Sequence, residues 1–272
     1  MTKAALDRKA LVVNLGGGVI GDMGGFVAGT YKRGIDFAQV PTTLLAQVDA
    51  SVGGKLGIDF NGLKNHIGLF RNPIGVYINP MFLETLSFEE KRSGFAEIVK
   101  HHLIADNEAW QKLKEITDLN ELGYPNLIQH SIDIKSRIVE SDPEEKGARK
   151  SLNFGHTVGH AVETYFLESG NRLLHGEAIA IGMICEAWIS HQIGTLSEDE
   201  LTEITEFFLR FYPKSKILTN TYPAIVHFAK NDKKNQDGKI LCTLLNGIGE
   251  FQVNVSIDHS QITKSLDYYN EQ

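Results

Sequence analysis

The strongest constraint on the fold is an apolar run that leads into a glycine turn and then into a helix of small residues. Residues 10–15 are apolar and β-prone, residues 16–22 read Gly-Gly-Gly-Val-Ile-Gly-Asp, and residues 23–30 are mostly small. Tight packing is one reading of this pattern, because its spacing is not GxGxxG with an acidic residue about 20 positions on. However, strand, glycine turn and helix in this order also present backbone N–H groups to a phosphate. We predict a nucleotide-binding α/β domain here.

Composition limits the class of protein. With 272 residues, 42% of them hydrophobic, the chain is near the size at which one core gives way to two domains. A net charge of −7 with scattered Lys and Arg argues against a nucleic-acid partner. Cys185 and Cys242 stand in apolar runs without CxxC spacing, which predicts buried free thiols in a reducing compartment. No apolar run reaches the length of a membrane span and residues 1–9 lack a signal-peptide core, so we expect a cytoplasmic protein without membrane contact.

Two imidazoles stand four residues apart, at His156 and His160. In a helix these positions share one face, so helix geometry alone would make both imidazoles ligands of one metal ion. A polar helix face is the alternative for such a pair. A third imidazole follows at His175, and Glu97 sets a carboxylate in an apolar segment. Two imidazoles and one carboxylate form the ligand set of a catalytic zinc ion, which predicts a metal site.

Charged and polar side chains are dense between positions 31 and 65, in a segment that otherwise looks buried. They are Arg33, Asp49, Lys55, Lys64 and Asn65. A charge inside an apolar run costs several kcal/mol unless it is paired, so such residues form either salt bridges or a binding site. Their number favours a binding site, in which Arg and Lys suit a phosphate or carboxylate and Asp49 suits a hydroxyl group.

Six segments of the chain, in order, resemble 3-dehydroquinate synthases. They are residues 16–22, 31–35, 39–55, 94–100, 152–163 and 174–177. The resemblance covers nearly the whole chain, and its longest segment is very specific. It implies an NAD- and zinc-dependent lyase of the shikimate pathway, which serves chorismate and aromatic amino acid biosynthesis. The substrate, a sugar-phosphate acid, would be 3-deoxy-D-arabino-heptulosonate 7-phosphate, converted to 3-dehydroquinate and phosphate.

The resemblance also implies roles for individual residues. The ligands of Zn²⁺ or Co²⁺ would be Glu97, His156 and His175, with His160 beside the metal near the substrate. The other catalytic and substrate-binding residues would be Arg33, Asp49, Lys55, Lys64, Asn65, Lys100, Lys135, Arg149 and Asn153. The NAD-binding residues would be Gly18, Val19, Ile20, Gly21, Asp22, Thr42, Thr43, Lys55, Lys64, Phe82, Leu83, Glu84 and Thr85. One lysine of the pair Lys233 and Lys234 would reach the substrate phosphate.

In the implied mechanism the metal polarises a substrate hydroxyl while NAD takes a hydride from the same carbon. The resulting ketone acidifies the neighbouring C–H, phosphate leaves, and the hydride returns before ring opening and aldol closure. Lys and Arg side chains fix one conformer of the substrate through its phosphate and carboxylate.

The predicted architecture is α/β. A partial dinucleotide-binding α/β domain at residues 1–86 precedes a mainly α-helical metal- and substrate-binding domain at residues 87–272. A second strand is expected at residues 35–40, ending at Thr42 and Thr43. Helices are predicted at residues 89–105, 107–116, 125–141, 155–167, 176–193 and 197–211, and late strands at 241–245 and 250–255 around the hairpin signal Asn246-Gly247.

The sequence departs from the family pattern at two kinds of position. Leu56 and Leu63 stand where the family has Thr and Gly, and neither position supplies an essential polar group. The family also carries roughly a hundred residues before the glycine turn, including elements that hold the adenosine half of NAD. We therefore expect a fragment, or a start placed at an internal Met, that binds NAD weakly alone. A homodimer is also expected.

Three other functions remain open. A related sugar-phosphate cyclase would keep the metal and NAD residues but change those that bind the carboxylate, and Arg149 and Lys135 argue against it. A metal-dependent polyol dehydrogenase of similar fold has no need for many phosphate-binding lysines. An inactive truncated paralogue would act as a metal-binding or regulatory module. For Arg149 and Lys135 themselves, a salt bridge to Glu140 or Asp142 is the alternative to carboxylate binding.

Overall fold

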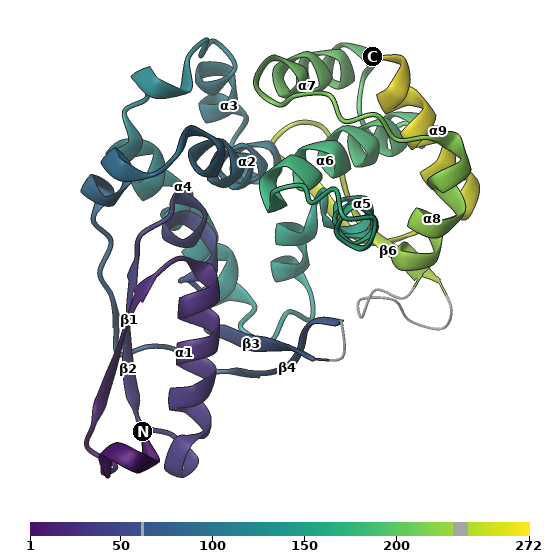
Figure 1. Cartoon of the computed structure of the whole chain (residues 1–272). Coiled ribbons are helices and arrows are strands. Elements are labelled where there is room, and N and C mark those ends of the chain that lie inside the picture. The colour runs from purple at the N-terminus through teal and green to yellow at the C-terminus, as the bar shows by residue number, and fades with distance from the viewer. Residues whose placement is uncertain (61–62, 231–238) are drawn as a thin grey trace. The chain divides into compact units, whose positions relative to one another are not determined.

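A computed structural model describes residues 1–60, 63–230 and 239–272 of the chain (Figure 1). The candidate phosphate contacts Lys233 and Lys234 lie outside the described residues, as do the side chains of Lys64 and Asn65. The chain divides into two compact units. Unit 1 comprises Met1–Gly94 and Gly123–Arg137, and unit 2 comprises Phe95–Leu122 and Ile138–Gln272. The division at residue 86 stays a prediction.

Unit 1 is built on a parallel sheet that begins as the sequence predicts. Strand β1 (Leu11–Gly16) runs parallel to β2 (Asp36–Pro41), which in turn pairs with the short β5 (Gly75–Val76). Helix α1 (Gly18–Thr30) follows β1 after a single residue, and contacts β1 and β2 (Figure 1). The helix thus starts earlier than predicted. Most of the glycine segment therefore forms its first turns, and the turn proper is confined to the end of β1 and the N-cap Gly17.

The rest of unit 1 contains elements that the sequence pattern did not predict. Strands β3 (Lys55–Phe60) and β4 (Leu63–Phe70) form an antiparallel hairpin, and residues Ala46–Ala50 form a π-helical turn. The core includes Ala28 of α1, Phe37 of β2 and Leu56 of β3, each less than 9% exposed. The departure at Leu56 is thus accounted for, because its side chain fills the core beneath α1. Two helices continue from unit 1 into unit 2, α2 (Phe88–Ala105) and α4 (Tyr124–Ser141).

Unit 2 is mainly helical, as predicted. Its own helices are α3 (Asn107–Leu113), α5 (His156–Glu168), α6 (His175–Gln192), α7 (Glu198–Phe211), α8 (Tyr222–Lys230) and α9 (His259–Glu271). The late hairpin is confirmed as β6 (Ile240–Leu245) paired antiparallel with β7 (Phe251–Ile257). Short 3₁₀ helices in the two units lie at Thr2–Ala4, Tyr31–Arg33, Pro80–Thr85, Leu119–Glu121, Ala148–Asn153 and Thr219–Thr221. The α/β class is therefore confirmed.

Helix α6 is the central element of unit 2. It is apolar around most of its circumference, as expected of a helix covered on all sides, and it packs against α5, α7 and α9. Both predicted free thiols are confirmed as buried, Cys185 on α6 and Cys242 on β6. In the described ranges, no helix combines the length and the apolar composition that crossing a membrane requires.

Candidate active site

Three side chains from three helices of unit 2 converge on one point. They are Glu97 of α2 and the first residues of α5 and α6, His156 and His175. Oε1 of Glu97 lies 3.6 Å from Nε2 of His156 and 3.6 Å from Nε2 of His175. Glu97 is fully buried and the two imidazoles are largely so. Three ligand atoms therefore face one another inside the unit.

This donor set fits a zinc-like ion. Metal–ligand distances of about 2.0–2.2 Å in a tetrahedral arrangement place ligand atoms roughly 3.4 Å apart, close to the two spacings observed at Glu97. Two imidazole nitrogens and one carboxylate oxygen leave the fourth position open, which is the pattern of a catalytic ion. Lys100 donates to Oε2 of Glu97 from the next turn of α2, and both side chains are buried. The ion pair thus uses one carboxylate oxygen and leaves Oε1 toward the imidazoles.

The orientation of both imidazoles is fixed on the far side of the ring. Nδ1 of His156 lies 3.0 Å from the carbonyl oxygen of Phe154, and Nδ1 of His175 lies 3.2 Å from Oε2 of Glu163. A carbonyl and a carboxylate oxygen only accept, so each Nδ1 carries a proton and each Nε2 is the atom available to a metal. Burial lowers the pKa of His175, but the Glu163 and Glu97 carboxylates outweigh it and raise that pKa to about 9.

His160 lies one turn further along α5, as the spacing predicts. Its ring centroid is 5.0 Å from that of His156 and 5.9 Å from that of His175. Among the described residues, the converging groups of three in unit 2 contain His156 or His160 but not both; the second group is His160, Glu163 and His175. Helix spacing alone predicts His156 and His160 as a ligand pair, and neither group contains both of them. The ligand roles themselves stay a prediction.

A buried glutamate that sequence reasoning missed holds the start of α5. The N-cap of this helix is Gly155, which has no side chain to cap the first N–H groups. Glu186 of α6 replaces it, because its fully buried carboxylate accepts from the N–H groups of Gly155 (2.6 Å), Thr157 (2.8 Å) and Val158 (3.0 Å). A carboxylate about three turns into α6, the helix that begins with His175, thus holds the first turn of α5, the helix that begins with His156.

The segment just before α5 carries two further predicted residues, Arg149 and Asn153. The Arg149 guanidinium is buried and donates to the carbonyl oxygen of Pro143 (2.7 Å), while its backbone N–H donates to Asp142 (3.1 Å). Hydrogen bonds from main-chain N–H groups, foremost that of Gly147, lower the pKa of Asp142. Asn153 donates to the carboxylate of Glu145 (3.0 Å), a residue that sequence reasoning missed. The predicted acid Asp142 is thus a partner of the Arg149 backbone.

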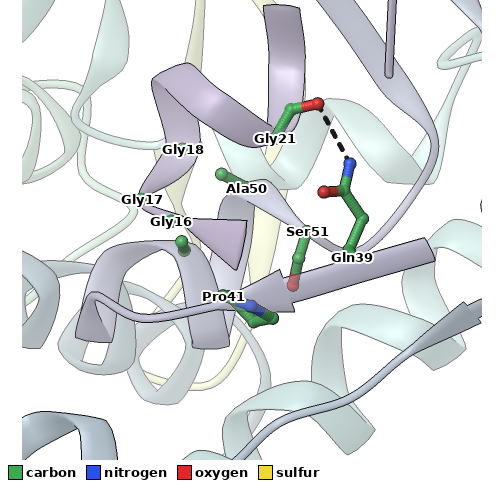
Figure 2. Close-up of a pocket in the computed structure, with 9 residues that line it drawn as sticks. Gly16, Gly17, Gly18, Gly21, Gln39, Pro41, Ala50 and Ser51 are labelled. Carbon is green, nitrogen blue, oxygen red and sulfur yellow. Dashed lines mark hydrogen bonds between the residues drawn. The ribbon is translucent and has the colours of Figure 1, made fainter. Parts of the chain in front are cut away.

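In unit 1, a hollow lies where β1 ends and α1 begins (Figure 2). Its empty space, open solvent included, is about 190 Å³, and it is lined by Gly16, Gly17, Gly18, Gly21, Gln39, Pro41, Ala46, Ala50 and Ser51. The Gln39 amide closes one side by donating to the carbonyl oxygen of Gly21 (3.1 Å). The hollow is shallow, and it lies at a helix N-terminus, which suits a phosphate at the surface.

The structure brings several predicted residues of unit 1 to this end of the sheet. Thr42 donates its backbone N–H to the carbonyl oxygen of Gly16 (3.0 Å), and the Thr43 hydroxyl accepts from the N–H of Ala46 (3.2 Å). The 3₁₀ helix that contains Phe82, Leu83, Glu84 and Thr85 follows Asn79, whose carbonyl oxygen accepts from the buried Gln47 (3.0 Å). Gln47 also donates to Pro41 at the end of β2 (3.2 Å). Val19 and Ile20, in contrast, are exposed on α1.

The other predicted charged residues of unit 1 are Lys135, Asp49, Lys55 and Arg33, and they lie in different surroundings. Lys135 of α4 forms an ion pair with Asp49 of the π-helical turn at 2.7 Å. Lys55 is exposed at the start of β3. Arg33 is also exposed and precedes β2, whereas the glycine turn adjoins the end of that strand, roughly 20 Å away. Within one chain, Arg33 therefore does not join the other predicted residues of unit 1.

Comparison with known proteins bears on the family. A family model described as 3-dehydroquinate synthase N-terminal matches residues 1–93, and one described as 3-dehydroquinate synthase C-terminal matches residues 94–235. The chain belongs to the 3-dehydroquinate synthase family. The 3-dehydroquinate synthase of Parabacteroides distasonis is 42% identical over 273 residues, which cover 100% of this chain and 77% of the relative. That of Campylobacter curvus is 41% identical over 96% of this chain and 75% of its own length. The predicted family is confirmed.

Solved structures agree with this membership. A 2-epi-5-epi-valiolone synthase from Streptomyces hygroscopicus subsp. jinggangensis, with NAD⁺ and Zn²⁺ bound, superposes with a TM-score of 0.88 at 28% identity, over 100% of this chain and 76% of that one. A 2-deoxy-scyllo-inosose synthase complexed with carbaglucose-6-phosphate, NAD⁺ and Co²⁺ gives 0.86 at 26% identity, over 98% and 76%. A glycerol dehydrogenase from Schizosaccharomyces pombe gives 0.64 at 12% identity, over 99% and 71%, and shares the fold alone.

Proposed function

We propose that the chain is a 3-dehydroquinate synthase, a carbon–oxygen lyase that converts 3-deoxy-D-arabino-heptulosonate 7-phosphate to 3-dehydroquinate and phosphate with NAD and a zinc-like ion. The observation that carries the proposal is the convergence of Glu97, His156 and His175 in unit 2. Identity of 41–42% to 3-dehydroquinate synthases over nearly the whole chain supports it. A homodimer belongs to the proposal as well.

The chain's own residues have defined tasks at this site. Glu97, His156 and His175 would hold the ion. When bound, the ion stabilises a developing alkoxide on the substrate, and NAD accepts and returns a hydride. Lys100 holds the Glu97 carboxylate in place through Oε2. His160, partly exposed one turn from His156, is positioned to exchange a proton with the substrate at a ring nitrogen.

The remaining roles follow the family pattern. The hollow at Gly18 and Gly21 and the adjoining Thr42 and Thr43 would hold the phosphates of NAD, because backbone N–H groups at the start of α1 are available there. Substrate contacts are proposed for Asp49, Lys55, Lys100, Lys135, Arg149 and Asn153. The ion pair of Lys135 with Asp49 supports such a role. Their side chains are only 7% and 26% exposed, and burial of a charged pair contributes little to stability, which favours a functional role for it.

The test is an assay of phosphate release from the heptulosonate phosphate, with NAD and Zn²⁺ supplied, alongside elemental analysis of each protein. Glu97→Ala and His175→Ala should each lose both the ion and turnover. Glu168→Gln, at the exposed end of α5, is the control and should retain both. Full metal content in His175→Ala would contradict the ligand assignment. Turnover that persists without bound metal would contradict the proposed mechanism.

A related sugar-phosphate cyclase is the second candidate, favoured by the two cyclase structures that superpose at TM-scores of 0.88 and 0.86. The two candidates differ in whether the substrate has a carboxylate. Arg149→Ala should lower turnover of the heptulosonate phosphate on the order of a hundredfold, because a guanidinium binds a carboxylate through two hydrogen bonds. A sugar phosphate without the carboxylate should be a poor substrate for the wild type and nearly insensitive to the substitution. Equal losses on both substrates would favour the second candidate.

A further inference from the structure

We infer that Glu163 is a positioning residue for the metal ion, which it influences by fixing the tautomer and the direction of the His175 ring. The inference rests on the metal site of the proposed function and extends it to a side chain outside the proposed ligand set. Glu163 lies two turns into α5, and His175 is the first residue of α6. Oε2 of Glu163 lies 3.2 Å from Nδ1 of His175.

This contact determines which ring nitrogen faces the other ligands. A carboxylate oxygen accepts a hydrogen bond from Nδ1–H, so the lone pair of neutral His175 is on Nε2. Nε2 is the nitrogen that lies 3.6 Å from Oε1 of Glu97. A carboxylate behind a metal-binding imidazole also makes the ring nitrogen more basic and holds the ring in one plane. Glu163 therefore fixes the direction in which Nε2 of His175 meets the ion.

The two imidazoles of the site are oriented by different kinds of acceptor. The orientation of His175 therefore depends on Glu163 more than that of His156 depends on any side chain. His156 is oriented by the carbonyl oxygen of Phe154, two residues earlier in the chain. That contact is local and forms with the helix start itself. His175 is instead oriented by a side chain from another helix, Glu163 of α5. Removal of Glu163 should therefore loosen one ligand while leaving the other in place.

A competing reading gives Glu163 a direct role. Ligand atoms of His160, Glu163 and His175 also lie within 4.8 Å of one another, so Glu163 could itself contact an ion. The two readings differ in the expected cost of a conservative change. Glutamine keeps an oxygen that accepts from Nδ1–H but gives a weak metal ligand. A positioning residue therefore tolerates Glu163→Gln far better than a ligand does.

The experiment is a titration of the metal-free protein with Zn²⁺ in competition with a chromophoric chelator. Circular dichroism first establishes that every variant is folded. Glu163→Ala should bind one ion about 10–100-fold more weakly than the wild type, which is the usual effect of removing such a partner. Glu163→Gln should lose less than Glu163→Ala. The control Glu168→Gln, on the same helix and exposed, should match the wild type.

Each outcome separates the possibilities. Wild-type affinity in Glu163→Ala would overturn the inference and leave the metal site standing. Complete loss of the ion in Glu163→Gln would overturn it in favour of a direct ligand. A wild type that binds no ion would remove the metal site and the inference with it. Co²⁺ adds a signature that a merely structural role would not move, since the visible absorption of the bound ion in Glu163→Ala should change with the direction of the His175 ligand.

Discussion

Two glycine-rich regions of the molecule use glycine for different purposes. Where α5 meets α6 in unit 2, a Cβ atom on Gly182 would lie 1.9 Å from the carbonyl oxygen of Gly155 and 2.6 Å from the nitrogen of Gly159. At the turn of unit 1, a Cβ on Gly18 would meet only the Cβ of Ala50 at 3.3 Å, and one on Gly21 would meet the Gln39 side chain at 3.1 Å. Glycine closes a backbone contact in the first region and keeps a surface clear in the second.

The comparison shows whether a substitution in each region should change stability or ligand binding. The α5–α6 contact has no space left for anything else, so the separation of His156 from His175 is set by main chain against main chain. At the turn of unit 1 the nearest atoms belong to side chains, those of Ala50 and Gln39, and the turn adjoins the hollow described above. The metal region should therefore respond to substitution through stability, and the turn through binding.

The largest effect is expected for Gly182→Ala. The added methyl meets backbone atoms that cannot move without separating α5 from α6, so the free energy of unfolding should fall by about 3 kcal/mol. Urea unfolding followed by circular dichroism measures the change. Gly123→Ala is the control, because a Cβ there meets nothing within 4 Å. Equal stability of the two variants would remove the distinction between the regions.

A smaller loss is expected for Glu186→Ala. The substitution leaves the N–H groups of Gly155, Thr157 and Val158 without the carboxylate that accepts from them in the interior. Lost hydrogen bonds to a charged group cost about 2–3 kcal/mol in free energy of unfolding. The same urea experiment applies, with Glu168→Ala as the exposed control. Stability within about 0.5 kcal/mol of the wild type would mean that water replaces the carboxylate.

Without bound metal, the free energy of unfolding should depend on pH through His175 at the candidate metal site. The folded-state pKa of His175 is raised from 6.5 to about 9. Its contribution to stability is therefore fully present below about pH 6.5 and is lost as the pH rises toward 9. Urea unfolding in the presence of a chelator, at several pH values across this window, measures it. His175→Ala should lack this component of the slope, and an unchanged slope in that variant would assign the effect to another group.

The smallest change in stability is expected for Gly18→Ala, although its effect on ligand binding should be clear. Alanine favours a helix over glycine by about 1 kcal/mol, which offsets the close contact with Ala50. The methyl would project where a phosphate approaches the helix start, so NAD should bind at least tenfold more weakly. Saturation-transfer NMR with NAD detects even weak binding. An NAD affinity equal to that of the control Gly123→Ala would show that the turn serves packing alone.

The sequence predicted elements whose information is local. The helices that carry His156 and His175 and the late hairpin have short-range signals, and they were confirmed to within a few residues. The glycine turn also has such a signal, but the helix after it begins at Gly18 and not at residue 23 as predicted. Helix α9 also had such a signal, because Asp258 and Gln261 form a capping box before the apolar positions Ile262 and Leu266. The predicted helices end at residue 211 and do not include it.

Other features could not be found from the sequence because they exist only between elements. Glu163 and Glu186 act on residues 12 and up to 31 positions away, through the packing of α5 on α6. Residue types alone brought Glu97 and His175 into the candidate metal site, helix spacing added His160 as a ligand, and the family resemblance placed His160 beside the metal instead. The position of Arg33 at the opposite end of β2 depends on the direction of a strand. Sequence spacing does not contain these relations.

The buried thiol of Cys185 can report how often helix α6 of unit 2 opens. Burial raises the pKa of this thiol to about 12, and its hydrogen bond to the carbonyl oxygen of Ser265 lies inside the unit. The thiolate is the form that attacks an electrophilic reagent, so modification of Cys185 requires α6 to open. The rate of modification therefore depends on how often α6 opens, and α6 is the helix that begins with His175. A bound ion that holds the start of α6 should slow this reaction, so the rate of thiol modification would report whether the site is occupied.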